Sequence, residues 1–221
     1  GMGEKSIVEI ASVFKEAKML DSSSPLSQQM FESIPQIAYL ASNPYGNLKP
    51  GYVTIENETS LLVLQSHENA VKSKRVHAEN FRYIETESNK INAAKIVQPV
   101  GEQCVIVNPP YPTMTTEELD AVYALPFQYH PHPKYKGKHI PAYEMIRFSV
   151  CMHRGCFGGC SFCTISAHQG KQITSRSSDN ILRQIAILKD LPDWKGYLSD
   201  LGGPSANMYN MGGFDKNICK K

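Results

Sequence analysis

The chain of 221 residues lacks a long hydrophobic run and an excess of charge of either sign. No apolar stretch reaches the roughly 18 residues that a membrane-spanning helix needs. The amino-terminal GMGEKSIVEIASVFKEAK also lacks the basic-then-apolar pattern of a secretory signal. Its 23 basic and 21 acidic residues are spread along the chain and give a net charge of +2, so a nucleic-acid partner is not implied. We expect a cytoplasmic protein with no membrane partner.

Cysteine is present, but not in the arrangement of a disulfide-rich secreted domain. The six cysteines are unevenly spaced in a long chain without a secretory signal, which favours a reducing compartment and a metal site over disulfides. Cys104 lies inside the apolar run CVIV and is interpreted as a small core residue, while Cys219 has no predicted role. The other four are Cys151, Cys156, Cys160 and Cys163.

The first hundred residues have the pattern of a mixed α and β region. Helical spacing of apolar residues over 3–18 predicts one helix, which SSSP at 22–25 ends. Residues 37–65 hold β-rich runs around an NPYG turn, typical of a hairpin or a small sheet. Residues 67–97 predict two helices, and the following CVIV run predicts a short buried strand ended by prolines.

We expect residues 101–143 to be a connector that holds this short strand and a proline-rich loop. Residues 111–143, which include the proline-rich FQYHPHPKYKGKHIPAY, are expected to be ordered but irregular. Its histidines alternate with prolines, and we interpret them as turn or surface residues rather than metal ligands. They are His130, His132 and His139.

Residues 144–221 follow the order strand, loop, helix, strand. EMIRFSV predicts a strand that leads into the cysteine-rich loop, and KGYLSDLGGP predicts a second one. Between them lies a helix with Ser177 or Ser178 as its N-cap and Pro192 at its end. In a parallel βαβ unit such loops lie at the carboxyl ends of the strands, where α/β proteins build their sites. The predicted apolar face of the helix consists of Ile181, Leu182, Ile185, Leu188 and Leu191.

Three cysteines in RGCFGGCSFCTISAHQGK are close enough to bind one inorganic group. A closed zinc site needs four ligands, and Cys151 would have to supply the fourth. A [4Fe–4S] cluster held by three thiolates instead leaves one iron open to a substrate or cofactor. Gly158 and Gly159 would let the loop wrap closely around such an anionic cluster.

CFGGCSFC matches the CxxxCxφC motif of radical S-adenosylmethionine (SAM) enzymes, where φ is an aromatic residue. The chain also resembles the YgiQ-like family of radical SAM proteins in several further segments. These are VNPPYPTMTTEELDAVYALP, PHPKY, IPAYEMIRFSV, SRS and SDLGGPSANMY. The resemblance implies that Cys156, Cys160 and Cys163 bind a [4Fe–4S] cluster whose open iron chelates SAM. It also implies a reducing partner such as flavodoxin or ferredoxin.

The same resemblance implies a reaction and further contacts. One electron would cleave SAM to methionine and a 5′-deoxyadenosyl radical, which abstracts hydrogen from a substrate that the sequence does not identify. Phe162 corresponds to the residue beside the adenine, and Gly202 and Gly203 match the glycines that receive the SAM ammonium. Pro204 stands where the family motif has glutamate. No catalytic side chain is assigned.

The expected fold is α/β: the first βαβ portion of a partial (β/α)6 radical SAM barrel, preceded by a mixed α+β segment. The resemblance of GMGEKSIVEIA to a GxGE turn makes residues 1–100 the end of an upstream Rossmann-like domain plus that mixed segment. Residues 144–221 would then be the first part of the radical SAM core, so the chain looks like an internal fragment that is inactive alone.

Several alternatives stay open at this stage. The chain can be read as a radical SAM enzyme that modifies RNA, similar to methylthiotransferases, or as a non-enzymatic module in which four cysteines bind zinc or serve electron transfer. Arg176 can meet a carboxylate such as that of SAM, or form a salt bridge at the helix start. His153 and His168 flank the cysteine loop, where they can hydrogen-bond to the groups that hold a bound cluster, but ordinary exposure is the favoured interpretation for both.

Overall fold

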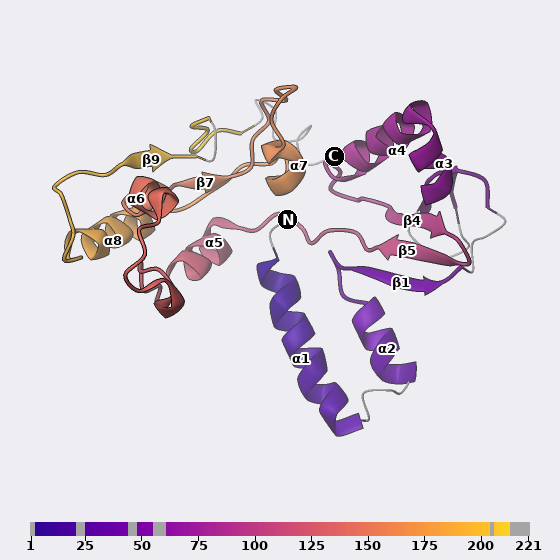
Figure 1. Cartoon of the computed structure of the whole chain (residues 1–221), viewed down its shortest axis with the longest axis horizontal. Coiled ribbons are helices and arrows are strands. Elements are labelled where there is room, and N and C mark those ends of the chain that lie inside the picture. The colour runs from indigo at the N-terminus through magenta and orange to yellow at the C-terminus, as the bar shows by residue number, and fades with distance from the viewer. Residues whose placement is uncertain (1–2, 21–24, 44–47, 55–60, 204–205, 213–221) are drawn as a thin grey trace. The chain divides into compact units, whose positions relative to one another are not determined.

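The computed structural model describes residues 3–20, 25–43, 48–54, 61–203 and 206–212. The chain forms two compact units, residues 1–112 and residues 113–221 (Figure 1). Both contain helices and strands, so the expected α/β class is confirmed. Within the described ranges, every helix is too short or too polar to cross a membrane.

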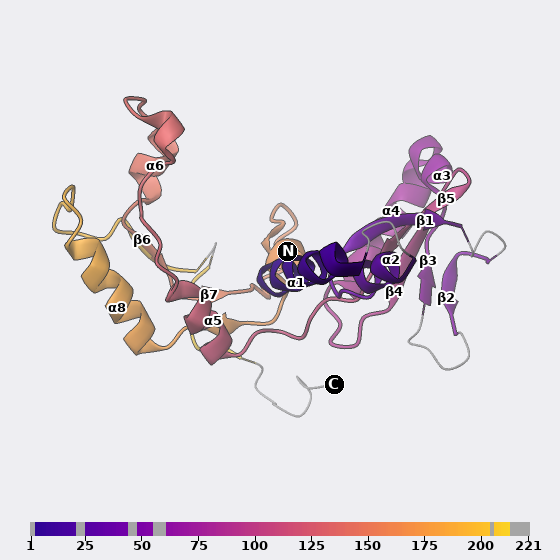
Figure 2. The same cartoon turned by 90° about the horizontal axis from the view of Figure 1, so that it is seen from below.

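Two helices begin the first unit. The predicted terminal helix is present as α1 (Glu4–Leu20), and α2 (Pro25–Glu32) follows it. The two lie side by side in both ribbon views (Figures 1 and 2), with the rings of Phe14 and Phe31 edge to face at 4.9 Å between centroids. Such an aromatic pair adds to the apolar burial that joins the helices.

A five-stranded sheet follows, in the order β1-β5-β4-β3-β2. All neighbouring strands are antiparallel except β3 and β4, which are parallel. The predicted β-rich region contributes β2 and β3 as an antiparallel pair, whereas β1 pairs with β5; most of the NPYG turn lies outside the described residues. The strands are β1 (Ala38–Ser42), β2 (Gly51–Val53), β3 (Leu61–Val63), β4 (Lys95–Val100) and β5 (Gln103–Val107).

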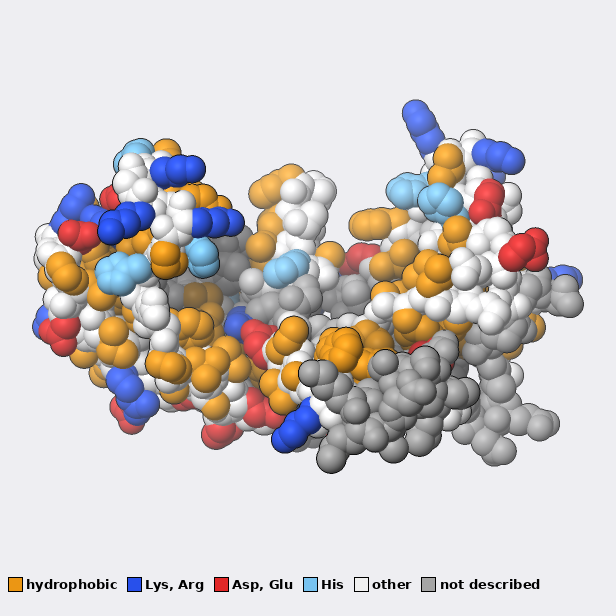
Figure 3. All heavy atoms as spheres, turned by 60° about the horizontal axis from the view of Figure 1, so that its bottom comes forward, with side chains coloured by type: hydrophobic (Ala, Val, Ile, Leu, Met, Phe, Trp, Pro, Cys, Tyr) orange, Lys and Arg blue, Asp and Glu red, His pale blue; other side chains and the backbone are white. Residues whose placement is uncertain are grey.

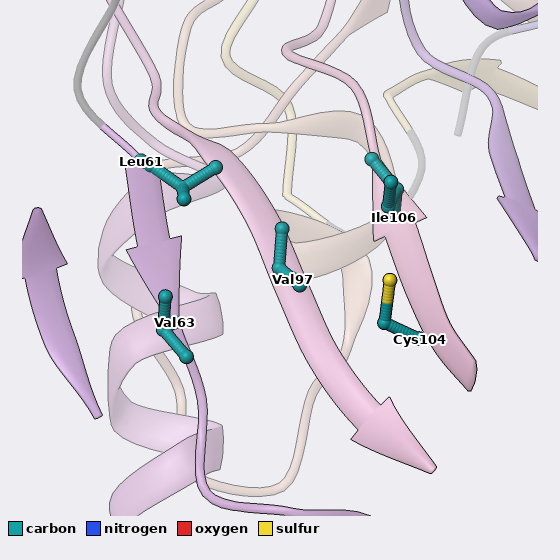
Figure 4. Close-up of a cluster of buried hydrophobic side chains, with 5 residues drawn as sticks. All are labelled: Leu61, Val63, Val97, Cys104 and Ile106. Atoms are coloured by element: carbon teal, nitrogen blue, oxygen red, sulfur yellow. The ribbon is translucent and has the colours of Figure 1, made fainter. Parts of the chain in front are cut away.

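Alternating side chains of this sheet form apolar clusters on its two faces. Cys104 is buried in one of them, as predicted, among residues of β3, β4 and β5 that Figure 4 labels: Leu61, Val63, Val97 and Ile106. Burial raises the pKa of the Cys104 thiol, which keeps it protonated. The two predicted helices are α3 (His67–Lys72) and α4 (Lys74–Glu87), and Tyr83 of α4 packs against Leu62 and Leu64.

Glu87, at the end of α4, is a buried carboxylate that ties three segments together. It accepts hydrogen bonds from Lys90 Nζ at 2.5 Å, Tyr52 Oη at 2.5 Å and Ala94 N at 2.7 Å. Burial by itself raises the pKa of Glu87, but these three donors favour the ionised form and bring the net pKa below its ordinary value. The ionised carboxylate therefore stabilises the folded state.

We predict that Glu87→Gln destabilises the protein by about 1–3 kcal/mol at neutral pH, the range for weakening buried hydrogen bonds to a charge. Because the folded-state pKa is depressed, the stabilisation is present above the unfolded-state pKa and is lost as pH falls through the folded-state value. Urea unfolding of Glu87→Gln and wild type should therefore converge at acid pH. Glu79→Gln, on the exposed side of α4, is the control, and equal stability of all three proteins at neutral pH would contradict the prediction.

The second unit contains the predicted strand–loop–helix–strand order. Strands β6 (Ser149–Cys151) and β9 (Asp200–Gly202) are parallel neighbours, and α8 (Ser178–Lys189) runs between them in sequence. Ser177 is the N-cap of α8, with its hydroxyl accepting from Asn180 N at 3.2 Å, as predicted. The remaining elements are α5 (Thr116–Tyr123), η1 (Pro133–Tyr135), α6 (Pro141–Ile146), β7 (His153–Arg154), α7 (Ile165–Gln169) and β8 (Thr174–Ser175).

Val150, Ile181 and Leu188 form the core of this unit, with Ile185 and Leu191 packed against them. Four of the five residues predicted for the apolar face of α8 thus pack into this core. Leu182 does not: it is exposed, because one step along a helix turns the side chain by about 100° from its neighbour's direction.

Two secondary-structure predictions for this unit were wrong. Residues 144–146 of the predicted strand EMIRFSV belong to α6, which Pro141 begins with a helix-compatible φ, and the strand starts only at Ser149. Residues 116–123 form α5 within a region expected to be irregular. The boundaries at residues 100 and 143 stay a prediction.

Candidate functional site

The cysteine loop, residues 155–173, is closed at its base by a short antiparallel ladder. Strand β7 precedes the loop and β8 follows it, with His153 opposite Ser175 and Arg154 opposite Thr174. Inside this ladder Cys156 N donates to Gly170 O at 3.0 Å, so the first cysteine is tied to the far end of the loop. The two ends of the loop are therefore held together by backbone hydrogen bonds.

Gly155, at the start of the loop, has room for no side chain. Its φ is +87°, in the left-handed region, and a Cβ would lie 1.9 Å from Gln172 O. Its N–H donates to the Gln169 side chain at 3.1 Å. Glycine here lets the two ends of the loop meet directly in front of Cys156.

The three cysteines lie at different depths. Cys156 is buried, Cys163 is half-buried and Cys160 is exposed. Cys163 N donates to Cys160 O at 3.0 Å, which closes a turn that carries these two cysteines. A Cβ on Gly158 would lie 3.5 Å from Cys156 Sγ and 3.7 Å from Cys160 Sγ, so both sulfurs flank this glycine.

The described side chains do not form a site for a single metal ion. Across the described part of the chain, no three His, Cys, Asp or Glu side chains converge closely enough to bind one metal ion. An iron–sulfur cluster makes a different demand, because each thiolate binds its own iron. The structure places the sulfurs of Cys156 and Cys160 beside Gly158, and the backbone bond from Cys163 N to Cys160 O holds the third cysteine in the adjoining turn.

Cys151 makes its hydrogen bonds outside the cysteine loop. Its thiol donates to His153 O at 3.1 Å, and its carbonyl accepts from Arg176 Nη1 at 2.7 Å. It also neighbours Tyr123, whose pKa is raised by burial and by this thiol. The geometry thus gives no support to a zinc site in which Cys151 is the fourth ligand.

Phe162 lies in the turn between Cys160 and Cys163, and 89% of its side chain is exposed. Burying an aromatic ring is favourable, so a ring left in water beside the thiols is available to stack on a bound ligand. The role at an adenine stays a prediction.

Gly202 and Gly203 lie at the end of β9 and just beyond it, next to the strand that leads into the cysteine loop. A Cβ on Gly202 meets only Asp200 Oδ1, at 3.7 Å. A Cβ on Gly203 would lie 1.9 Å from His153 Nε2 and 2.8 Å from Ala206 O. Packing against His153 is thus a structural reason for glycine at 203, independent of any ligand. Pro204 lies outside the described residues.

Arg176 is buried, and all its donors are used inside the protein. Its three nitrogens donate to Asn180 Oδ1 at 2.8 and 2.6 Å, to Gln184 Oε1 at 2.6 Å and to two backbone oxygens. The guanidinium also stacks on Tyr123, 4.0 Å from the ring centroid. This geometry supports neither of the two interpretations made from the sequence, a salt bridge at the helix start or a contact to the SAM carboxylate. Instead, Arg176 joins the start of α8 to β6 by hydrogen bonds.

The expected exposure of the histidines holds except at one position. His130, His132, His139 and His168 are exposed, and His132 Nδ1 accepts from Lys134 N at 3.2 Å as the N-cap of η1. His153 is fully buried instead. The expectation of exposure was wrong because β7 turns this side chain under the end of β9. Cys219 lies outside the described residues.

Sequence reasoning missed α5, which supports the helix that follows the cysteine loop. Thr115 and Glu118 form a reciprocal capping box, with bonds of 3.2 and 2.9 Å. Asp120 of α5 then accepts from Ser177 N at 3.0 Å, at the start of α8. The T-x-x-E pattern at 115–118 was the signal that would have found this helix.

Comparisons with known proteins agree on one family. The model of the family described as "Radical SAM N-terminal" matches residues 1–149. A UPF0313 protein of Bacteroides thetaiotaomicron is 53% identical over 224 residues, which cover 100% of this chain and 35% of the relative. A UPF0313 protein of Porphyromonas gingivalis is 50% identical over 100% of this chain and 32% of its own length. The UPF0313 protein YgiQ of Escherichia coli is 47% identical over 69% of this chain and 21% of its own length.

The chain therefore spans about a third of the length of the first of these curated relatives. No solved structure matches it.

Proposed function

This chain belongs to the YgiQ-like radical SAM family, and from that premise we propose that its cysteine loop holds a [4Fe–4S] cluster used to cleave SAM. The observation that carries the proposal is that the Cys151 thiol lies in a different environment from the cysteines of the loop. Cys156 and Cys160 flank Gly158, whereas the Cys151 thiol donates to His153 O. Three thiolate ligands, and not four, leave one iron open.

In this proposal Cys156, Cys160 and Cys163 are the cluster ligands. When bound and reduced by one electron, such a cluster supplies reductive cleavage of SAM to methionine and a 5′-deoxyadenosyl radical that abstracts hydrogen from a substrate. The chain itself orients the ligands, through the β7–β8 ladder at the loop base and the bond from Cys156 N to Gly170 O. Phe162, Gly202 and Gly203 are the proposed contacts to SAM. The substrate stays unassigned, and the reductant is a flavodoxin- or ferredoxin-type protein.

The proposed fold around this site is the first part of a partial (β/α)6 barrel. The parallel pair β6 and β9, with α8 between them in sequence, is the repeating unit of such a barrel. Leu182 and Ile187 of α8 and Leu201 of β9 are exposed. Exposed hydrophobic side chains (orange) are a general feature of the surface that Figure 3 draws. Further βα units packed here would cover these apolar side chains.

Anaerobic reconstitution of the full-length protein tests the proposal. We expect about four iron and four sulfide per chain and formation of 5′-deoxyadenosine after reduction with SAM present. A protein that binds zinc and no sulfide, or that loads a cluster but never forms 5′-deoxyadenosine, would overturn it.

One observation favours the RNA-modifying alternative. The surface segment 130–139 is exposed throughout and carries Lys134, Lys136 and Lys138 with no acidic residue. Lysines beside an exposed ring such as Tyr135 suit phosphates and bases. Binding of RNA by the full-length protein, lost when the three lysines become glutamine, distinguishes this alternative.

Phe162→Ala tests SAM binding apart from cluster assembly. No ligand is removed, so iron content should be unchanged, but loss of a stacking surface should weaken SAM binding by about 1–3 kcal/mol. Phe157→Ala, also a partly exposed ring in the same loop, is the matched control. The measurement is SAM titration of the reconstituted full-length protein. If Phe162→Ala loses iron but binds SAM normally per remaining cluster, Phe162 shapes the loop and does not contact SAM.

A further inference from the structure

His153 is a buried histidine with one ring nitrogen satisfied and the other not. Its side chain has 0% exposure. Nε2 accepts a hydrogen bond from Met208 N at 2.9 Å, which requires that nitrogen to be unprotonated. In the neutral ring the proton therefore sits on Nδ1, and within the described ranges Nδ1 has no hydrogen-bond partner. A buried donor without an acceptor is costly, so it needs an explanation.

The ring is fixed in place, so this donor cannot turn away. Gly203 lies so close to Nε2 that even a methyl group there would collide with the ring. The bond from Met208 N holds the same edge. A donor that stays unsatisfied and immobile is preorganised for an acceptor that arrives with a ligand.

His153 is connected to the cysteine loop through the backbone and through Met208. It lies on β7, three residues before Cys156, and it packs against Gly203 at the end of β9. The residue that it holds, Met208, places its Cε 3.7 Å from the position of a Cβ on Gly158, the glycine flanked by two cysteine sulfurs. His153 thus joins the strand end at Gly203 to the segment that contacts the loop.

We propose that His153 is a ligand-binding residue whose Nδ1–H donates a hydrogen bond to an anionic group held at the cysteine loop. The inference rests on the proposed function, which supplies two acceptors of this chemistry: a sulfur of the cluster or the carboxylate of SAM. Hydrogen bonds to cluster sulfurs tune the reduction potential, and a bond to a carboxylate adds binding affinity. Met208 N uses the other ring nitrogen, so the two functions of the ring are separable.

Two substitutions separate the two hydrogen-bonding functions of the His153 ring. Glutamine places its carbonyl near the position of Nε2, and asparagine places its amide N–H near that of Nδ1. His153→Gln keeps an acceptor for Met208 N and loses the free donor. His153→Asn keeps the donor and loses that acceptor. The exposed His139→Gln is the control. Each is made in the full-length protein, with iron content, cluster reduction potential and SAM affinity measured after anaerobic reconstitution.

His153→Gln should load iron as wild type does and then change one property of the loaded site. If the acceptor is a cluster sulfur, the potential measured without SAM shifts to more negative values, because a bond that favours the reduced cluster is lost. If the acceptor is the SAM carboxylate, that potential is unchanged and SAM binds roughly 10- to 100-fold more weakly, the range for a hydrogen bond to a charged group. His153→Asn should keep both properties near wild type.

A measurement on the wild type tests the cluster-sulfur acceptor without any variant that has to fold. If the acceptor is a cluster sulfur, ¹⁵N-labelled histidine should give a nitrogen coupling to the reduced cluster in electron–nuclear double resonance, and His139→Gln should retain it. Unchanged potential and SAM affinity in His153→Gln at full iron loading overturn the inference and leave the proposed function standing. No nitrogen coupling in a loaded wild type rules out a cluster sulfur as the acceptor, and a SAM affinity in His153→Gln equal to that of the wild type then overturns the inference. A wild type that loads no cluster overturns both.

Discussion

Alanine at any one of Cys156, Cys160 or Cys163 will abolish the iron–sulfur absorption of the reconstituted full-length protein, whereas alanine at Cys151 will leave it intact. Each of the three loop thiolates anchors one iron in the proposed site, so removing one leaves the cluster without a corner. Cys151 instead donates its thiol to His153 O, and losing that bond costs only about 1 kcal/mol of folding stability. Iron and sulfide per chain, with the visible spectrum, are the measurements.

Cys151 is a demanding control because it lies five residues before Cys156 and in the same unit. A second control is Cys104→Ala, in the apolar cluster of the first unit, which should lower stability and leave iron unchanged. If Cys151→Ala lost metal as completely as the other three variants and the metal were zinc, the site would be a closed zinc site with four cysteine ligands.

Local patterns predicted the elements around the site because they depend on neighbouring residues. The Ser177 cap and the spacing of Ile181, Ile185 and Leu188 were enough to place α8, and the segment KGYLSDLGGP predicted the strand after it. The loop between the two strands was also predicted from its sequence, and its binding of a cluster stays a prediction. These are short-range signals, and they failed at residues 144–146, which continue the helix that Pro141 begins.

Contacts between distant segments could not be read in the same way. Gly203 looked like a glycine kept for a ligand, yet His153, 50 positions earlier, already excludes any side chain there. His153 itself looked exposed, since nothing near it in sequence shows that β9 and Met208 close over it. Only the pairing of β6 with β9 brings these residues together.

Arg176 also makes contacts between distant segments that the sequence did not predict. Replacing it should have the largest effect on the free energy of unfolding. Arg176→Ala removes the donors to four acceptor atoms: Cys151 O on β6, Gln184 Oε1 on α8, and both Oδ1 and O of Asn180. Each buried acceptor left without a partner costs about 1–3 kcal/mol. Loss of the stack on Tyr123 adds to this, so we expect a destabilisation of roughly 3–5 kcal/mol.

Arg176→Lys should not rescue the stability, because a lysine ammonium cannot reproduce the planar set of donors that meets Asn180 and Gln184 at once. Arg183→Ala, an exposed arginine on α8, is the matched control and should change stability by less than about 0.5 kcal/mol. Thermal and urea unfolding, followed separately from iron content, are the measurements. If Arg176→Ala folded with wild-type stability but bound SAM poorly, the guanidinium would be a ligand contact after all, and the hydrogen bonds to β6 and α8 would not be what keeps it buried.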